Sequence, residues 1–253
     1  MTIKNSTKEI YNNQSFSWAR VTPSIVSDFT GRPPTLEMCG NVKGKSVLDL
    51  GCGEGYCTRI LASQCPREII GVDISDEMIN RAVTQEQIDQ FGINYICADA
   101  NSLEEKNLSL DLILAMFVFN YISIEEMKSI LKNVYKLLKD NGEFVFAVPH
   151  PSLAFIRKSK SLPFYFDSAE YDYFSARNNE LKGQIWRRSG EVLNVRSYHK
   201  TFEDYFDVIK YAGFSNIDKV KELYVTDDIF NIDSIFFEPL RGIPLHVAFK
   251  LIK

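Results

Sequence analysis

The chain has 253 residues, 45% of them hydrophobic and 25% charged, with a formal net charge of −4 at pH 7. This composition is typical of soluble globular proteins with one large α/β domain, and it excludes collagen-like, coiled-coil and extensively disordered chains. The mild negative charge gives no general attraction for nucleic acid or anionic membranes, so we expect neither as a partner.

The N-terminal residues 1–14 are polar, and the longest apolar run, residues 112–119, is far shorter than the roughly 20 residues that a membrane helix needs. Five cysteines without a CxxC pair indicate reduced thiols, and with three histidines they give no recognised zinc spacing. We therefore expect a cytoplasmic protein without a bound metal, either a monomer or a homodimer.

Short β-branched runs alternate with amphipathic stretches from residue 45 onward, which is the pattern of a parallel sheet covered by helices on both faces. The motif SIEE at 123–126 is a capping box that opens a long amphipathic helix. Two earlier helices, at 8–19 and 23–29, lie outside the sheet within an N-terminal helical lid, residues 1–44. We predict strands at 46–50, 68–73, 93–98, 110–116 and 143–148, and helices at 56–64, 76–90 and from 123 on.

The regular alternation stops after Pro149, and residues 151–200 are rich in aromatic and turn residues. We interpret this segment as a substrate cap inserted into a sheet domain whose cofactor-binding core is residues 45–150. A helix at 201–212 and strands at 214–220 and 245–251 follow. Residues 201–253 thereby complete the sheet of a single domain spanning 1–253.

The sharpest motif is VLDLGCGEG at 47–55, a strand that leads directly into a glycine-rich turn and a helix. Glycines at alternate positions let a ligand lie against bare backbone at the carboxyl end of the sheet. Asp73 ends the second strand 22 residues after Gly51, as expected for an acid that binds a ribose diol. Asp49 and Asp99 belong to the first and third strand ends, and packing alone does not explain three such acids.

The turn itself discriminates between nucleoside ligands. A dinucleotide fingerprint, G-x-G-x-x-G, places a pyrophosphate at the helix N-terminus. Here the third glycine comes one residue early, and Glu54 inside the turn would repel a phosphate. S-adenosylmethionine carries a sulfonium and an ammonium group and no phosphate, so the charges favour it over NAD.

Four segments resemble, in order and spacing, the cofactor blocks of the class I S-adenosylmethionine-dependent methyltransferases: VLDLGCGEG at 47–55, GVDIS at 71–75, CADA at 97–100 and LDLILAMFVFNYI at 110–122. The resemblance covers residues 40–150 well and 201–253 loosely. It implies an α/β fold with a doubly wound, Rossmann-like sheet of seven mostly parallel strands, the last one antiparallel, plus the N-terminal helices and the inserted cap. It also implies S-adenosyl-L-methionine as cofactor and S-adenosyl-L-homocysteine as product.

The same resemblance assigns parts of the cofactor to the strand ends. Arg20 resembles an arginine that grips the methionine carboxylate in quinone-methylating relatives, and a surface arginine on a helix is the alternative. The implied cofactor-binding residues are Gly51 and Gly53 for the methionine part, Asp73 for the ribose, Asp99 and Ala100 for the adenine and Met116 for the adenosine, with Asp49, Ile74 and Ala115 beside them.

The family does not fix the methyl acceptor. The segment AMFVFNY at 115–121 departs from the Asn/Asp-Pro-Pro-Tyr block that serves exocyclic amines and glutamine, so O-, N- or C-methylation of a small molecule leads. Aromatic residues of the cap can form the apolar walls of a pocket, or they can simply pack the cap onto the sheet. The candidate substrate-binding residues are Trp18, Phe119, Tyr165 and Trp186.

Charge and histidines leave further alternatives open. The cap has nine basic residues against five acidic ones, which suits either an anionic acceptor or a solvated face. His150 and His199 are the candidate catalytic bases, with a structural role in turns as the alternative, and we interpret His246 as a packing residue. A non-catalytic S-adenosylmethionine-binding partner or sensor is the competing function; a nicotinamide dehydrogenase is disfavoured by the missing third glycine.

Overall fold

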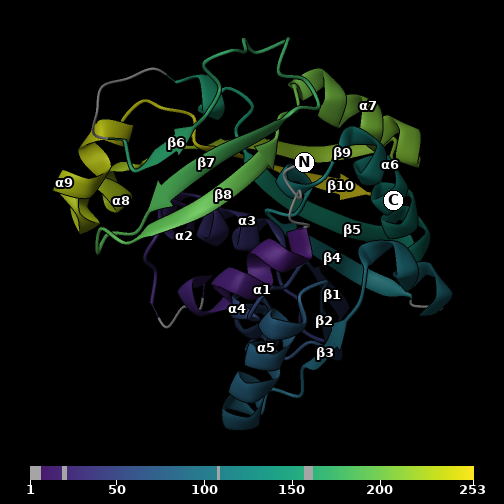
Figure 1. Cartoon of the computed structure of the whole chain (residues 1–253). Coiled ribbons are helices and arrows are strands. Elements are labelled where there is room, and N and C mark those ends of the chain that lie inside the picture. The colour runs from purple at the N-terminus through teal and green to yellow at the C-terminus, as the bar shows by residue number, and fades with distance from the viewer. Residues whose placement is uncertain (1–6, 19–21, 107–108, 157–161) are drawn as a thin grey trace.

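A seven-stranded sheet forms the centre of the protein (Figure 1). The structure is a computed structural model that describes residues 7–18, 22–106, 109–156 and 162–253. The strand order is β3-β2-β1-β4-β5-β10-β9, in which β10 runs antiparallel to both neighbours and the remaining pairs are parallel. The predicted fold class is thereby confirmed. The strands are β1 (Ser46–Leu50), β2 (Glu68–Asp73), β3 (Asn94–Cys97), β4 (Leu110–Met116), β5 (Leu138–Pro149), β9 (Asn216–Leu223) and β10 (His246–Ile252).

Alternation along the buried strands assigns side chains to two apolar layers. Leu48 and Leu50 of β1 lie in the layer that α6 and α7 cover, whereas Val47 lies in the opposite layer with α3 and α4. The predicted capping box is present, because Ser123 Oγ accepts the N–H of Glu126 and the Glu126 carboxylate accepts the N–H of Ser123. The helices of these layers are α3 (Arg32–Met38), α4 (Tyr56–Ala62), α5 (Asp76–Asp89), α6 (Ile124–Leu137) and α7 (Phe202–Ala212).

Most predicted bounds agree with the structure to within a few residues, and β5 differs most. It begins at Leu138, which pairs with Leu110, rather than at the predicted residue 143. The chain bends at Asn141, whose φ of 61° is left-handed, and then continues as a strand. Asn141 and Gly142 therefore lie within the strand.

The predicted cap segment contains a second sheet that the sequence pattern did not reveal. Its order is β6-β7-β8, with both pairs antiparallel. Phe164, Phe166 and Leu181 of this sheet share an apolar cluster with Phe237 and Leu240 near the C-terminus. In Figure 1 the sheet lies beside α8 and α9, which were not predicted. These elements are β6 (Phe164–Phe166), β7 (Glu180–Trp186), β8 (Val192–Tyr198), α8 (Asp227–Ile232) and α9 (Ser234–Phe237).

The N-terminal helices lie between the two sheets. Trp18 of α1 packs in one cluster with Met78 of α5 and Leu193 of β8, so α1 contacts both α5 and the three-stranded sheet. In the described part of the chain, no helix is both long enough and apolar enough to span a membrane. The N-terminal helices are α1 (Thr7–Trp18) and α2 (Val26–Thr30), followed by α3; short 3-10 turns are η1 (Ala100–Lys106), η2 (Phe119–Tyr121), η3 (Leu153–Phe155) and η4 (Glu238–Leu240).

Candidate active site

A cavity of about 590 Å³ opens at the carboxyl ends of β1, β2 and β4. The glycine turn after β1 forms its floor, α1 covers one side, and the three-stranded sheet with α2 covers the other. This volume lies within the range typical of small-molecule sites, about 300 to 1,000 Å³. Of the predicted site residues, its lining includes Asp49, Gly51, Gly53, Asp73, Ile74, Asp99, Ala100, Met116, Trp18 and Trp186.

The glycine turn combines a close contact with open backbone. Gly51 and Gly53 have left-handed φ values of 71° and 56°. A Cβ at Gly51 would collide with the side chain of Val118, so only glycine fits where the turn passes the end of β4. A Cβ at Gly53 would meet nothing within 4 Å, which leaves this stretch of backbone open to the cavity.

Asp73 is positioned by the turn that it faces. Its Oδ2 accepts the backbone N–H of Gly53 at 2.8 Å, and its Oδ1 accepts that of Ser75 at 2.9 Å. Burial raises the pKa of Asp73, while the bonds from Ser75 and Gly53 oppose that rise. A carboxylate offers about four acceptor sites, so capacity remains for the two hydroxyls of a ribose.

Asp49 is the most buried acid of the site, at 1% exposure. Its Oδ2 accepts the hydroxyl of Thr58 at 2.6 Å, whereas its Oδ1 has no hydrogen-bond partner among the described residues. Burial raises the pKa of Asp49 to about 7. A buried carboxylate oxygen beside the open glycine turn suits a bound cation, and the ammonium group of S-adenosylmethionine is one.

The remaining cofactor candidates lie farther along the same edge. Asp99 is exposed at the end of β3, where its Oδ1 accepts the N–H of Asn101 at 2.7 Å. Ala100 and Met116 line the cavity beside it, but Ala115 is fully buried in β4 and is absent from the lining. The prediction for Arg20 lies outside the described residues.

Helix α1 covers the cofactor side through contacts that the sequence did not reveal. Asn12 Oδ1 accepts the hydroxyl of Ser75 at 2.6 Å, and Lys8 pairs with Asp76 at 2.9 Å, so α1 lies on the N-terminus of α5. Tyr11 packs edge-on against Tyr121, at 5.3 Å between ring centroids, and both line the cavity. No motif in residues 7–18 indicated these contacts, because they depend on where α5 begins in space.

The opposite wall is apolar. The predicted substrate residue Trp186 lines it, whereas Tyr165 points outward and is 53% exposed between two buried phenylalanines, as alternation along a strand requires. Phe119 is fully buried against the rings of Phe144 and Phe146 and does not line the cavity. The apolar wall contains Ile25, Val26, Leu153, Pro163, Phe164, Phe166, Ile185, Trp186, Val195 and Leu245.

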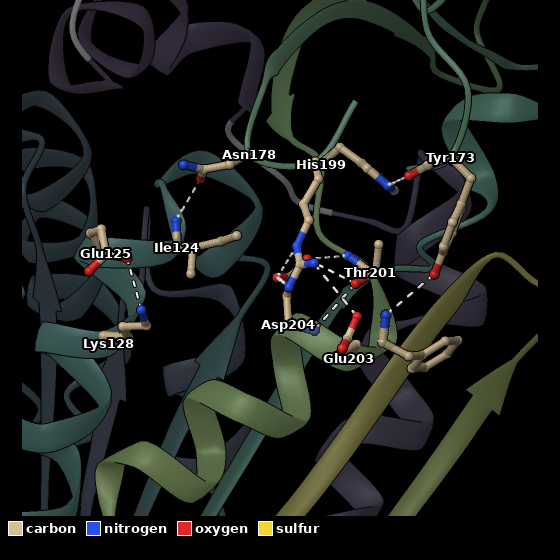
Figure 2. Close-up of polar contacts among 11 residues, drawn as sticks. Ile124, Glu125, Lys128, Tyr173, Asn178, His199, Thr201, Glu203 and Asp204 are labelled. Carbon is tan, nitrogen blue, oxygen red and sulfur yellow. Dashed lines mark hydrogen bonds and ion pairs between the residues drawn. The ribbon is translucent and has the colours of Figure 1, made fainter. Parts of the chain in front are cut away.

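Neither candidate catalytic histidine lines the large cavity. His199 Nε2 donates to the backbone carbonyl of Tyr173 at 2.8 Å, as Figure 2 shows, so this nitrogen already carries a proton. His150 Nε2 donates to Glu222 at 2.8 Å, and its Nδ1 accepts from Ser152 at 2.7 Å. Burial lowers the pKa of both histidines. Their geometry corresponds to the structural alternative, so neither enters the proposal below.

Four of the six basic residues that the structure describes in the predicted cap are engaged in ion pairs. Arg177 pairs with Asp204, the N3 residue of the Thr201 capping box. Asn178 Oδ1 accepts the N–H of Ile124 at 2.8 Å (Figure 2). These contacts anchor the segment to the first turns of α6 and α7. Further pairs are Arg187 with Glu191, Arg188 with Asp233 and Arg196 with Glu180.

Lys200 is buried at 1% exposure where β8 leads into α7. Its Nζ donates to the carbonyl oxygens of Phe119 at 2.8 Å and Ile122 at 2.5 Å. Burial lowers the pKa of Lys200 to about 7. This side chain therefore ties the second sheet to η2, whose Asn120 lines the cavity, and is not available to steer an anion.

The comparisons with known proteins point to one class. Residues 47–142 match the family model described as a methyltransferase domain. An uncharacterized protein of Haemophilus influenzae is 26% identical over 156 residues, 58% of this chain and 60% of that protein. A ubiquinone biosynthesis O-methyltransferase of Coxiella burnetii is 32% identical over 112 residues, 44% of this chain and 47% of that protein. The chain thus spans about half the length of these curated relatives.

Among solved structures, the magnesium protoporphyrin IX methyltransferase of Synechocystis with bound S-adenosylhomocysteine has a TM-score of 0.63 at 14% identity, covering 97% of both chains. At this identity the likeness shows the shared fold. The fold and the glycine turn that follows β1 are those of the Rossmann-like class of α/β proteins. The family match shows that residues 47–142 are a methyltransferase domain, in agreement with the class I S-adenosylmethionine-dependent methyltransferases that the sequence resembles.

Proposed function

We propose that this protein transfers the methyl group of S-adenosyl-L-methionine to a small apolar acceptor, most simply an aromatic metabolite. The observation that carries the proposal is a single cavity lined on one side by the glycine turn and three acids and on the other by apolar cap residues. Such a cavity brings the two reactants together, and oriented reactants gain about 7 to 11 kcal/mol over free ones.

The cofactor fits the residues present. Gly53 leaves open backbone, Asp49 offers a buried oxygen without a partner among the described residues, and Asp73 retains acceptor capacity for a ribose. When bound, S-adenosylmethionine supplies an electrophilic methyl group on a sulfonium. The chain's own residues would orient the ribose through Asp73, hold the ammonium through Asp49 and receive the adenine near Asp99. The role of Arg20 on the carboxylate remains a prediction.

The apolar wall of the cavity supports the proposed class of acceptor. Its residues are mainly aliphatic and aromatic, which suits an apolar ring system. The arginines near it are paired with acids, and this pairing weakens the case for an anionic acceptor held by charge alone. The curated relative from Coxiella burnetii carries the name of an O-methyltransferase, which agrees with a small-molecule reaction. We propose that residues 151–200 act as the substrate cap of a single domain.

The test has two parts, cofactor binding and turnover. Calorimetry should give saturable binding of S-adenosylmethionine and none of NAD. Incubation with a panel of phenols, amines and carboxylic acids should then yield S-adenosylhomocysteine with some members of the panel and not without them. Tight binding with no turnover across the panel would favour the competing function, a non-catalytic S-adenosylmethionine sensor.

The site of action is proposed to be the cytoplasm. All five cysteines are free, three buried and two exposed, as expected where thiols stay reduced. To test this proposal, cells would be separated into a cytosolic and a secreted fraction. The protein should be found in the cytosolic fraction, with Cys65 and Cys97 reactive toward a thiol reagent.

A further inference from the structure

His246 is the first residue of β10, and the direction of that strand decides where it lies. The parallel strands end at the edge that holds the cavity, whereas β10 runs antiparallel and begins there. His246 pairs with Pro149 at the end of β5 and lines the cavity. A residue interpreted as packing within the last strand is therefore placed at the reactive edge of the sheet.

The hydrogen bonds of His246 determine which ring nitrogen carries its proton. Its Nδ1 lies 3.2 Å from Thr30 Oγ1, and that hydroxyl donates its single proton to the carbonyl of Val26 at 3.0 Å. With the Thr30 hydroxyl donating to Val26, the tautomer that satisfies both contacts has the proton on Nδ1 and leaves Nε2 unprotonated in the neutral ring. Burial lowers the pKa of His246 to about 3, with Arg32 and His150 acting in the same direction, so the neutral form holds at physiological pH.

Nε2 of His246 has no hydrogen-bond partner among the described residues. The ring packs edge-on against Phe117, with 5.0 Å between centroids. Phe117 directly follows β4 and precedes Val118, whose side chain lies against Gly51. Phe117 and Val118 thus connect the ring of His246 to the glycine turn, which the resemblance assigns to the methionine part of the cofactor.

We propose that Nε2 of His246 accepts the hydrogen bond of a hydroxyl group on an aromatic acceptor and takes its proton during O-methylation. This inference rests on the proposed function and specifies its substrate class. The hydroxyl oxygen forms a bond to the methyl carbon, the carbon–sulfur bond breaks with its electron pair remaining on sulfur, and the O–H proton moves to Nε2 and then to solvent.

The chemistry of the site selects a hydroxyl over the other acceptors. A carboxylate has no proton to give, and Arg32, whose guanidinium lies 5.2 Å from the centroid of the Phe117 ring, is already paired with Asp28 at 2.9 Å. Methylation of an alkylamine gives an ammonium ion with a pKa near 10, which would not protonate a histidine as weakly basic as this one. An alkylated hydroxyl is a far stronger acid than imidazolium, and it transfers its proton even to a weak base.

Two variants separate the two ring nitrogens. In His246→Asn the amide lies near the place of Nδ1, so the contact with Thr30 can persist while the Nε2 acceptor is lost. In His246→Gln the amide oxygen reaches the place of Nε2, so a hydrogen bond can persist while proton uptake is lost. The probes are catechol and 1,2-dimethoxybenzene, which differ in their hydroxyl protons, titrated by calorimetry into the protein loaded with S-adenosylhomocysteine.

The wild type should bind catechol about five- to tenfold more tightly than 1,2-dimethoxybenzene. His246→Asn should lose this preference, His246→Gln should keep most of it, and affinity for 1,2-dimethoxybenzene should be equal in all three proteins. With S-adenosylmethionine and catechol, His246→Gln should form S-adenosylhomocysteine about 100-fold or more slowly than the wild type.

Equal catechol affinity in wild type and His246→Asn, absence of catechol binding, or an undiminished rate in His246→Gln would overturn the inference. Binding of S-adenosylhomocysteine should be the same in all three proteins, which also shows that the variants fold. If the wild type does not bind S-adenosylhomocysteine, the proposed function itself fails, and this outcome is distinct from failure of the role of His246.

Discussion

The backbone N–H of Gly53 donates to Oδ2 of Asp73 at 2.8 Å, so the acid that ends β2 directly holds the glycine turn that follows β1. The two strands are neighbours in register, with Leu50 opposite Val72. Asp73 therefore shapes the turn, and we propose that its remaining acceptor sites bind the ribose of the cofactor.

Substitution of Asp73 should affect both the turn and the proposed ribose contact. Asp73→Ala should weaken S-adenosylmethionine binding about 10- to 100-fold, since hydrogen bonds to a charged group contribute about 1.5 to 3 kcal/mol. Asp73→Asn, which keeps one acceptor oxygen, should lose less affinity than Asp73→Ala. Calorimetric titration measures both variants, and unchanged affinity in Asp73→Ala would remove this residue from the cofactor site.

Asp49 should make cofactor affinity depend on pH. Because burial raises its pKa to about 7 in the empty protein, Asp49 must lose a proton before it can hold an ammonium group at lower pH. Affinity for S-adenosylmethionine should therefore rise by up to about tenfold per pH unit below 7 and level off above it. In Asp49→Asn the profile between pH 5.5 and 8 should be flatter, and a wild-type profile without slope would contradict this role.

The same raised pKa affects the stability of the empty protein. The folded state binds one more proton than the unfolded state between about pH 4 and 7, so the contribution of Asp49 to stability falls as pH rises through that window. Asp49→Asn should therefore have a higher free energy of unfolding than the wild type at pH 8, and this difference should be smaller at pH 5. Urea unfolding at the two pH values measures the difference, and an equal effect at both would contradict the shift.

Lys200 should give the opposite pH dependence. Its folded pKa of about 7 lies below the unfolded value of 10.5, so the unfolded state binds more protons between these values and stability rises with pH. Stability of the wild type minus that of Lys200→Met should increase by about 1 kcal/mol per unit from pH 7 to 9. Lys182→Met, at an exposed position of β7, is the matched control, and an identical profile for both variants would contradict burial of the charge.

Phe117 has a left-handed backbone, with φ of 58°, at the end of β4. An L-residue in this conformation costs about 1 to 2 kcal/mol, and glycine avoids that cost. Phe117→Gly should thus be more stable than Phe117→Ala by about 1 kcal/mol, although both lose the ring. At Val118, whose φ is −91°, the order should be reversed, so Val118→Ala should be more stable than Val118→Gly. Thermal unfolding of the four variants measures this difference.

The positions of the glycine turn and of Asp73 were predictable because their signals are local. Strand β1, the turn after it and Asp73 follow from a buried run, left-handed glycines and the spacing of one crossover unit. The capping box at Ser123 likewise needs only four consecutive residues to be recognised.

The acceptor side was not predictable in the same way. His246 lies at the cavity because β10 is antiparallel, and strand direction depends on the whole connection before it. Strands β7 and β8 pair with each other only once the cap segment has folded. Buried and exposed side chains alternate only weakly along β7, since much of this strand is half-buried. The position of α1 against α5 and β8 likewise depends on tertiary contacts, which the sequence does not show.

The central claim is that one cavity holds the methyl donor at the glycine turn and the acceptor under the cap. A crystal structure of the complex with S-adenosylhomocysteine tests it most directly. The account predicts the ribose hydroxyls on Asp73, the ammonium group on Asp49, and the sulfur facing free space lined by Phe117, Trp186 and His246. A ligand bound away from the glycine turn, or a sulfur closed off from the apolar wall, would contradict it.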